Sequence, residues 1–271
     1  MGVIIKTLKA LLLFILAGIC IFYLTGGRFV LGSSVKEMDT QNFDNYKDIK
    51  ALDIDLNLNE VMIEPSDEPM IEVEYPVYSN QAVQIKVNQE GDTLRITDSG
   101  KKFAHVDFPF FHNSLALTTV RIPKDYILDQ MTFKLDMGSL SVSEVKSRQT
   151  ALDLQMGSLT AEYANLGALT ADLNMGSIAF DEVELAGDSD LDLDMGSFDG
   201  SMKASKGTVK MKVSMGLVDL EMYDGNYKYL TDADMGDISV NNDGKSSQEY
   251  DAVIDIKASM GNVDIQSLNK E

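Results

Sequence analysis

The dipeptide Met-Gly recurs through the second half of the chain and constrains its fold more than any other feature. Successive copies are 19, 19, 20, 20, 20 and 25 residues apart, at Met137, Met156, Met175, Met195, Met215, Met235 and Met260. A fixed period of about 20 residues is typical of repeat proteins, in which one small unit stacks on the next. The spacing therefore predicts a stack of repeats.

Apolar and polar residues alternate on both sides of each Met-Gly pair. In the first repeat, Leu135 lies two positions before the Met, and Leu140 and Val142 lie three and five positions after it. This alternation predicts a strand on each side and a corner between them. Glycine suits a corner because it adopts positive φ without a Cβ clash. The predicted corners are Gly138, Gly157, Gly176, Gly196, Gly216, Gly236 and Gly261. The methionines are expected to point inward and to fill a narrow core.

These patterns predict an all-β chain, namely a parallel β-solenoid of about 20-residue coils preceded by one N-terminal transmembrane helix. The regular repeats span 131–271, and 46–130 hold a degenerate first coil and capping strands, with Leu58-Asn59 in the place of Met-Gly. Asn tolerates positive φ better than most residues, so this replacement fits a corner. The polar insertion 241–249 is expected to bulge outward without disturbing the stack. A leucine-rich repeat is the alternative at this period, but the sequence lacks its Asn/Cys ladder and its helical segment.

The N-terminus carries an uncharged run at 10–27, between Lys9 and Arg28. As a helix it would be about 27 Å long, enough to cross a bilayer core. The run predicts a membrane anchor over 10–31, between a cytoplasmic stub (1–9) and a polar stalk (32–45). Lys6 and Lys9 favour a cytoplasmic N-terminus. The predicted location is therefore the cell membrane, with a single pass and the C-terminal domain outside.

Two alternatives to this anchor concern processing of the same segment. A cleaved signal peptide is one, because Val30-Leu31-Gly32 is a passable cleavage site. Lipidation is the other, although Ile19 stands where a lipobox has a small residue before Cys20. Cys20 is the only cysteine, so the rest of the chain has no disulfide. An external domain without disulfides is typical of a bacterial surface protein.

The formal net charge is −20, and every acidic residue lies after residue 36. A surface this acidic repels nucleic acids, which excludes them as partners. Aspartates recur at the outward positions one and three residues before the Met. Stacking would place their oxygens within reach of a common Ca²⁺ ion. The metal candidates are Asp153, Asp172, Asp192, Asp194, Asp232 and Asp234. A solvated acidic face, screened by bulk cations, is the alternative.

The segment 103–112 interrupts the polar pattern with four of the 11 phenylalanines and both histidines of the chain. The candidate partner contacts are Phe103, Phe108, Phe110 and Phe111, as an exposed aromatic patch. A lid over the open end of the stack is the alternative. The repeats stay regular, without the unique residues that a catalytic site would need. The sequence therefore predicts no enzyme and no cofactor, with a polysaccharide-active enzyme as a distant alternative.

The segments RIPKDY (121–126), LDLQMGSLTAEY (152–163), ADLNMGSIAFDEV (171–183) and LDLDMGSFDG (191–200) resemble the bacterial putative-adhesin family. The resemblance covers about 46–268. It implies a β-solenoid at the cell envelope and provides no catalytic residues to carry over. The predicted function is a membrane-anchored, extracytoplasmic binding or adhesion module for an unknown protein or glycan. The alternative is an accessory component of an envelope-stress response that acts through a membrane partner.

Overall fold

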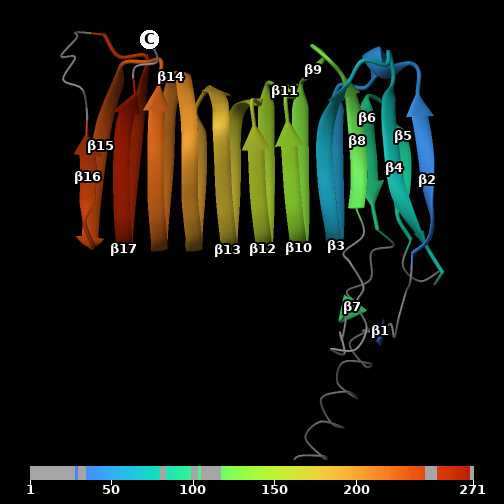
Figure 1. The fold of residues 1–271 in the computed structure, drawn as a ribbon, viewed down its shortest axis with the longest axis horizontal. Helices are drawn as coiled ribbons and strands as arrows, with labels where there is room; N and C mark the ends of the chain where they lie inside the picture. Colours follow the sequence, from blue (N-terminus) through green and yellow to red (C-terminus); the bar gives the residue numbers. More distant parts are fainter. Residues whose placement is uncertain are drawn as a thin grey trace, which may run out of the picture.

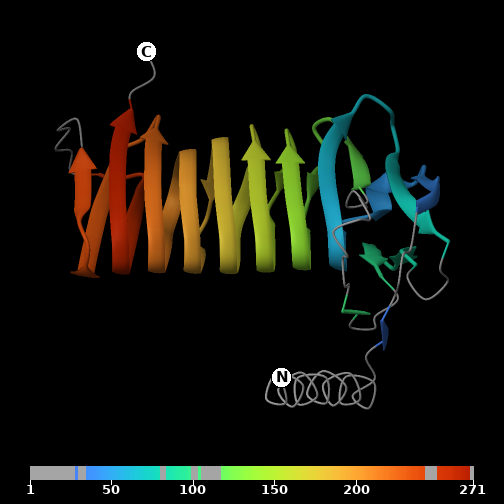
Figure 2. The ribbon, with the colours of Figure 1, turned by 60° about the horizontal axis from the view of Figure 1, so that its bottom comes forward.

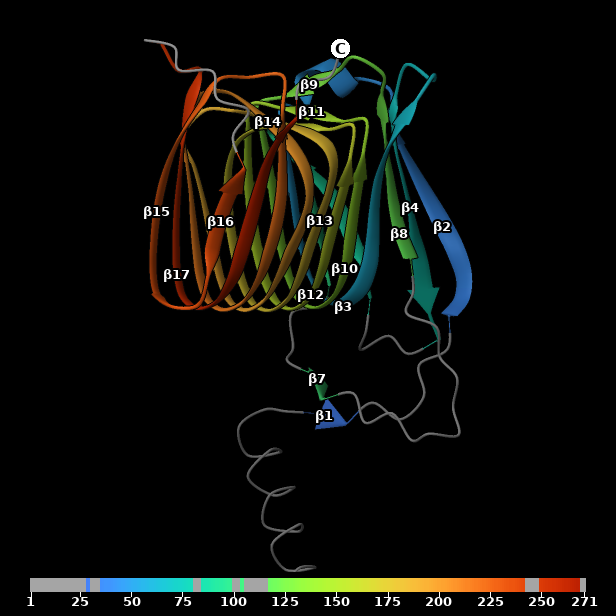
Figure 3. The ribbon, with the colours of Figure 1, turned by 60° about the vertical axis from the view of Figure 1, so that its left-hand side comes forward.

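In the computed structural model of the protein, the described residues are 28–29, 35–79, 84–98, 103–104, 117–241 and 249–268. Fifteen strands form one open sheet whose members stand side by side in a long row (Figure 1). The repeat half of this row comprises β9 (Ile127–Leu128), β10 (Gln130–Ser143), β11 (Lys146–Ser147), β12 (Gln149–Glu162), β13 (Asn165–Ala186), β14 (Ser189–Tyr223), β15 (Tyr227–Met235), β16 (Ile238–Asn241) and β17 (Ala252–Leu268). Its long strands run through the Met-Gly bends, which line up along one side of the molecule (Figure 3).

The N-terminal half contains strands of both directions and one short 3-10 helix. Its elements are β2 (Val35–Phe43), η1 (Tyr46–Asp48), β3 (Ala51–Ser66), β4 (Ile71–Tyr78), β5 (Lys86–Glu90), β6 (Thr93–Thr97) and β8 (Leu117–Pro123). A separate two-stranded sheet joins β1 (Arg28–Phe29) to β7 (Phe103–Ala104). Figure 2 shows the N-terminal strands gathered at one end of the row, beyond β3.

The repeats pair in parallel and in register. Met137 pairs with Met156 and, on its other side, with Leu58, while Gly138 pairs with Gly157 and Asn59. The predicted equivalence of Leu58-Asn59 to a Met-Gly pair is therefore confirmed. We call each repeat of the stack, with its one Met-Gly bend, a rung.

The predicted fold class is wrong in two respects, although the chain is all-β as expected. The first concerns strand direction, because the sheet is open and mixed rather than a purely parallel β-solenoid. The pairs β2–β4, β4–β8 and β5–β6 are antiparallel. The physical reason is clearest at Gly91-Asp92, the turn between β5 and β6. Two residues can connect antiparallel neighbours, whereas parallel neighbours need a longer crossover.

The second correction concerns the predicted membrane helix and the single-pass location that depended on it. Across the part of the chain that the structure describes, no helix is long and apolar enough to span a membrane. Most of the predicted anchor, 10–31, lies outside the described residues. Its described part, Arg28–Phe29, is strand β1 and pairs in parallel with Phe103–Ala104. The membrane anchor and the single-pass location are both wrong on this evidence.

The order of the rungs also differs from the sequence order. Strand β17 pairs with β14 on one side and with β15 and β16 on the other. The segment after the 241–249 insertion is thus placed between two earlier rungs, and the expectation that the insertion leaves the stack undisturbed is wrong. Figure 1 shows β17 between β14 and the β15–β16 edge.

Composition explains why β17 rather than β15 lies inside the sheet. Ile254, Ile256 and Ile265 of β17 are fully buried, whereas β15 carries Asp232 and Asp234 and is mostly exposed. A charged strand is suited to a sheet edge because it discourages pairing with other chains. The apolar strand gains more from two neighbours.

A single cluster of apolar side chains runs through the inside of the row, from Ile49 near the N-terminal end to Ile265 in β17. At the N-terminal end, Arg121 of β8 ties parallel and antiparallel strands together. Its Nε donates to Glu64 of β3 at 2.8 Å, and its Nη1 donates to Glu72 and Glu74 of β4. This network covers the place where the strand direction changes.

The seven methionines of the Met-Gly pairs are not core residues. They are between 36% and 63% exposed, whereas Leu135 and Leu140, on either side of the first pair, are buried. The prediction that they point inward is wrong. The chain bends between Leu135 and Leu140, and this bend turns Met137 outward.

Candidate functional site

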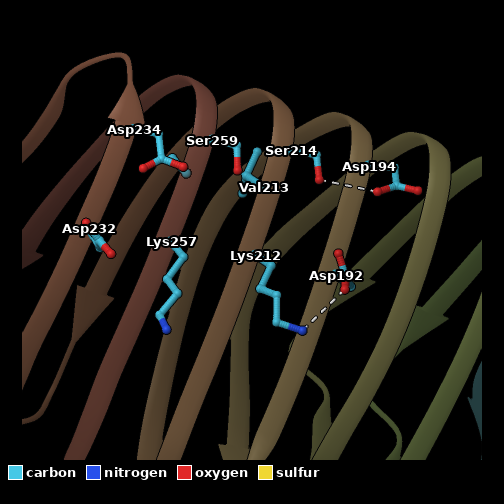
Figure 4. A pocket seen from close by; sticks show the side chains of 10 residues that line it. Asp192, Asp194, Lys212, Val213, Ser214, Asp232, Asp234, Lys257 and Ser259 are labelled. Atoms are coloured by element: carbon cyan, nitrogen blue, oxygen red, sulfur yellow. Dashed lines mark hydrogen bonds and ion pairs between the residues drawn. The ribbon is translucent and has the colours of Figure 1, made fainter.

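A hollow of about 320 Å³ opens on the face of the sheet formed by β14, β17 and β15. Figure 4 shows its side chains in two rows that run across neighbouring rungs. One row consists of the residues three before each Met, and the other of those one before it. We call this site the charged hollow; its polar lining is Asp192, Asp194, Lys212, Ser214, Lys257, Ser259, Asp232 and Asp234.

Strand order creates the charge pattern of the hollow. Because β17 lies between β14 and β15, Lys257 pairs in register with Lys212 on one side and with Asp232 on the other. Two neighbouring lysines are thus flanked by carboxylates at both ends, and acidic groups outnumber basic ones by four to two. Had the rungs followed the sequence, Asp232 would lie beside Lys212.

The two lysines differ in their partners. Lys212 Nζ lies 3.4 Å from Asp192 Oδ2 in an exposed ion pair, and Ser214 Oγ donates to Asp194 Oδ1 at 3.3 Å. Lys257 has no carboxylate within ion-pair distance among the described residues. The hollow therefore offers an ammonium group and several carboxylate oxygens to a ligand.

The six predicted Ca²⁺ candidates do not form one row. Asp153, Asp172 and Asp192 stand on successive rungs of β12, β13 and β14, with Asp194 beside them. Asp232 and Asp234 lie three rungs beyond Asp192, past the two rungs that carry the lysines. Within the described ranges, no group of three or more acidic, His or Cys side chains has the geometry to hold a metal ion.

Electrostatic repulsion is visible at the middle of the acidic row. Partial burial raises the pKa of Asp172, and the neighbouring carboxylates of Asp153, Asp192 and Asp194 raise it further. Burial is the larger cause of the raised pKa, and repulsion among the carboxylates adds to it. The row of carboxylates therefore attracts positively charged groups.

The seven predicted corner glycines stack directly on one another. A Cβ on Gly157 would lie 2.0 Å from the carbonyl oxygen of Gly138, and a Cβ on Gly176 would lie 1.9 Å from that of Gly157. Gly138 has φ of 152°, and Gly261 and Gly236 are also in the positive range. The other four glycines are required by space rather than by φ. The same contacts continue through Gly196, Gly216, Gly261 and Gly236, in that order.

The predicted aromatic contacts lie mostly beyond the described residues. Phe103 begins strand β7, whereas Phe108, Phe110 and Phe111 are outside the described part of the chain. Sequence reasoning did not find the charged hollow. It depends on a strand order that no local pattern shows, although the rows of Asp and Lys were visible.

The fold and the site together define an all-β repeat protein with a charged hollow on one face of its sheet. A family model described as Toastrack DUF4097 matches residues 49–271, and the chain belongs to this family. The resemblance to a family of adhesin-like proteins of unknown function is thereby confirmed. No curated protein matches the chain.

Solved structures with a low overall similarity carry names of a related kind. One is a "putative cell adhesion protein" from Clostridium sporogenes, 12% identical, covering 86% of this chain and 99% of its own, with a TM-score of 0.38. A "putative adhesin" from Bacteroides fragilis is 11% identical, with 86% and 98% covered and a TM-score of 0.35. A "putative lipid binding protein" from Parabacteroides distasonis is 13% identical, with 89% and 100% covered and a TM-score of 0.34.

Proposed function

We propose that the protein is a non-enzymatic binding module that recognises a partner presenting positively charged groups at the charged hollow. The observation that carries this proposal is the placement of β17. It places Asp232 and Asp234 at one end of the hollow and Asp192 and Asp194 at the other end, with two lysine-bearing rungs between them. At the equivalent position near the N-terminal end, Lys134 also lies between two carboxylates, Asp55 and Asp153, but there a single lysine rather than a pair separates them.

The electrostatics of the hollow support a cationic ligand. The chain carries a net charge of −20, which draws cations toward its surface. Carboxylates accept strong hydrogen bonds from ammonium and guanidinium groups. Lys257 adds specificity, because it repels a cation that is placed over the middle of the hollow rather than over its ends. A ligand with two positive groups separated by a neutral or acidic centre fits this pattern.

The alternative role in an envelope-stress response depended on a membrane helix, and no structural observation favours it.

A basic segment of another protein and an amino-bearing glycan both carry the positively charged groups that the charged hollow would bind. Trilysine and the trisaccharide of glucosamine represent these two sources, and a neutral trisaccharide of glucose serves as the reference.

The test is a calorimetric titration of the full chain with each probe at physiological salt. We expect the double variant Asp232→Asn/Asp234→Asn to weaken binding of one charged probe about tenfold. The control variant Asp153→Asn/Asp172→Asn also removes two carboxylates, both from the row three residues before the Met and both outside the hollow. It should change binding less than about twofold, as for exposed charges. Equal weakening by the two variants would show general attraction to an acidic surface. That result, or no binding of either charged probe, would refute the proposal.

A further inference from the structure

Seven exposed thioether groups stand in one line along the Met-Gly bends. In spatial order the methionine ladder is Met137, Met156, Met175, Met195, Met215, Met260 and Met235. We propose that the methionine ladder binds soft monovalent metal ions of the Cu(I) class, each held by the sulfurs of adjacent rungs. This inference does not depend on the charged hollow.

The exposure of these side chains has no explanation in the packing of the sheet. Met131, Met202, Met211 and Met222 fill the core and are completely buried. The ladder methionines are at least one third exposed. They stand at bends where a polar residue could take their place without burying a polar group. The neighbouring glycines are required because their backbones touch, but nothing in that contact requires Met at the position before them.

The register of the sheet pairs each ladder methionine directly with the ladder methionine of the next rung. Paired strands hold equivalent Cα atoms about 4.8 Å apart. A Met side chain has three rotatable bonds, so the thioethers of two neighbouring rungs can converge on one ion. Thioether sulfur is a soft ligand and selects Cu(I) over hard cations such as Ca²⁺ and Mg²⁺. Seven donors in a line therefore provide for about two or three ions.

The surroundings of the ladder favour a cation. The residue before each Met is Asp136, Gln155, Asn174, Asp194, Ser214, Ser259 or Asp234. Figure 4 shows Asp194, Ser214, Ser259 and Asp234 in a row beside the bends. Carboxylate and amide oxygens next to a neutral thioether lower the electrostatic cost of a bound positive charge. No lysine or arginine occupies this position in any of the seven repeats.

The experiment is an anaerobic competition for Cu(I) between the full chain and a chromophoric Cu(I) chelator, with ascorbate to keep the metal reduced. The wild-type chain is expected to remove about two or three ions from the chelator. Met38→Leu serves as a control, because Met38 is exposed but lies outside the ladder. This variant should retain all the binding.

Two triple variants distinguish shared ions from independent methionines. Met156→Leu/Met195→Leu/Met260→Leu leaves four methionines, no two of which are on adjacent rungs. Met215→Leu/Met260→Leu/Met235→Leu also leaves four, all of them adjacent. Leu has nearly the volume of Met, so the apolar character of the bends is kept. The first variant should lose at least tenfold in affinity, and the second should keep about half of the capacity.

A second measurement stays informative if a variant folds poorly. In the wild-type chain, Ag(I) can replace Cu(I), and the methyl carbon signals of methionine can be followed by nuclear magnetic resonance. The ladder signals should shift, while those of Met131 and Met202 in the core should not. No transfer of Cu(I), equal loss in the two triple variants, or shifts spread over buried and exposed methionines alike would each overturn the proposal.

Discussion

On one side of the repeats the chain bends through Met-Gly, and on the other side several bends contain a residue with positive φ that is not glycine. The second group comprises Asp125, Glu144, Tyr163, Glu182 and Asp224, with φ between 50° and 63°. At the Met-Gly bends, backbones of neighbouring rungs touch, so a Cβ has no space even where φ is ordinary. At the opposite bends the conformation is unusual, but the side chain extends toward solvent. Space controls the first bend, and backbone conformation controls the second.

The largest expected effect is at the Met-Gly bend. Gly157→Ala would place a Cβ 2.0 Å from the carbonyl oxygen of Gly138, and neither backbone can move without breaking the register. We expect a loss of about 3 kcal/mol in the free energy of unfolding, measured by chemical denaturation. Gly91→Ala is the control, because Gly91 has φ of 65° but no atom within 4 Å of the point where a Cβ would lie. The Gly91→Ala variant should lose about 1 kcal/mol in the free energy of unfolding, because alanine disfavours this positive φ. Equal losses would contradict the difference between the bends.

A smaller effect of opposite sign is expected at the other bend. Tyr163 has φ of 52° and is 58% exposed, so its side chain contributes little packing. Tyr163→Gly should stabilise the protein by up to about 1 kcal/mol, because glycine adopts this conformation without strain. The neighbouring Glu162→Gly, at an exposed position in β12, should instead destabilise it. Loss of stability in the Tyr163 variant would show that its side chain stabilises the bend.

The smallest effect concerns the acidic row beside the Met-Gly bend. The pKa of Asp172 is raised in the folded protein by partial burial and by its acidic neighbours, so the folded state binds more protons than the unfolded state. Its ionised form therefore lowers stability at neutral pH, and this loss diminishes as the pH falls through the raised pKa. Asp172→Asn should increase Tm slightly at pH 7 and not at pH 3. Asp199→Asn, in β14 and beyond the bend, is the control for the loss of one charge.

Much of the fold could be predicted from the repeat. The strands on each side of Met-Gly, the pairing of glycine with glycine and the degenerate copy at Leu58-Asn59 all follow from spacing and alternation. These features depend on local pattern and on identical rungs stacking in register. The antiparallel N-terminal pairs could not be predicted in the same way, because their pairing is not repeated.

The outward position of the methionines could have been inferred from the sequence. Counting from Leu135, alternation places Met137 inward, but counting back from Leu140 it places Met137 outward. The two buried leucines are five positions apart, so alternation must fail between them. That conflict is the sign of a bend, and a residue at a bend is exposed. The inward prediction followed the alternation from one side of the bend only.

The charged hollow and the order of the methionine ladder could not be predicted at all from local pattern. Both depend on the insertion of β17 between β14 and β15, which is decided by competition between two strands for an inner place in the sheet. The apolar Ile254 and Ile256 favour β17 for the inner place, and Asp232 favours β15 for the edge. Such a choice depends on whole strands rather than on any single motif.

Disulfide formation between engineered cysteines tests this order most directly. A disulfide needs Cα atoms about 4.4–6.8 Å apart, which neighbouring rungs satisfy and rungs one step further apart do not. In a chain with Cys20→Ser, the pair Met215→Cys/Met260→Cys should form a disulfide under mild oxidation. The pair Met215→Cys/Met235→Cys should not. The reverse result would place β15 beside β14 and would contradict the account of both the charged hollow and the methionine ladder.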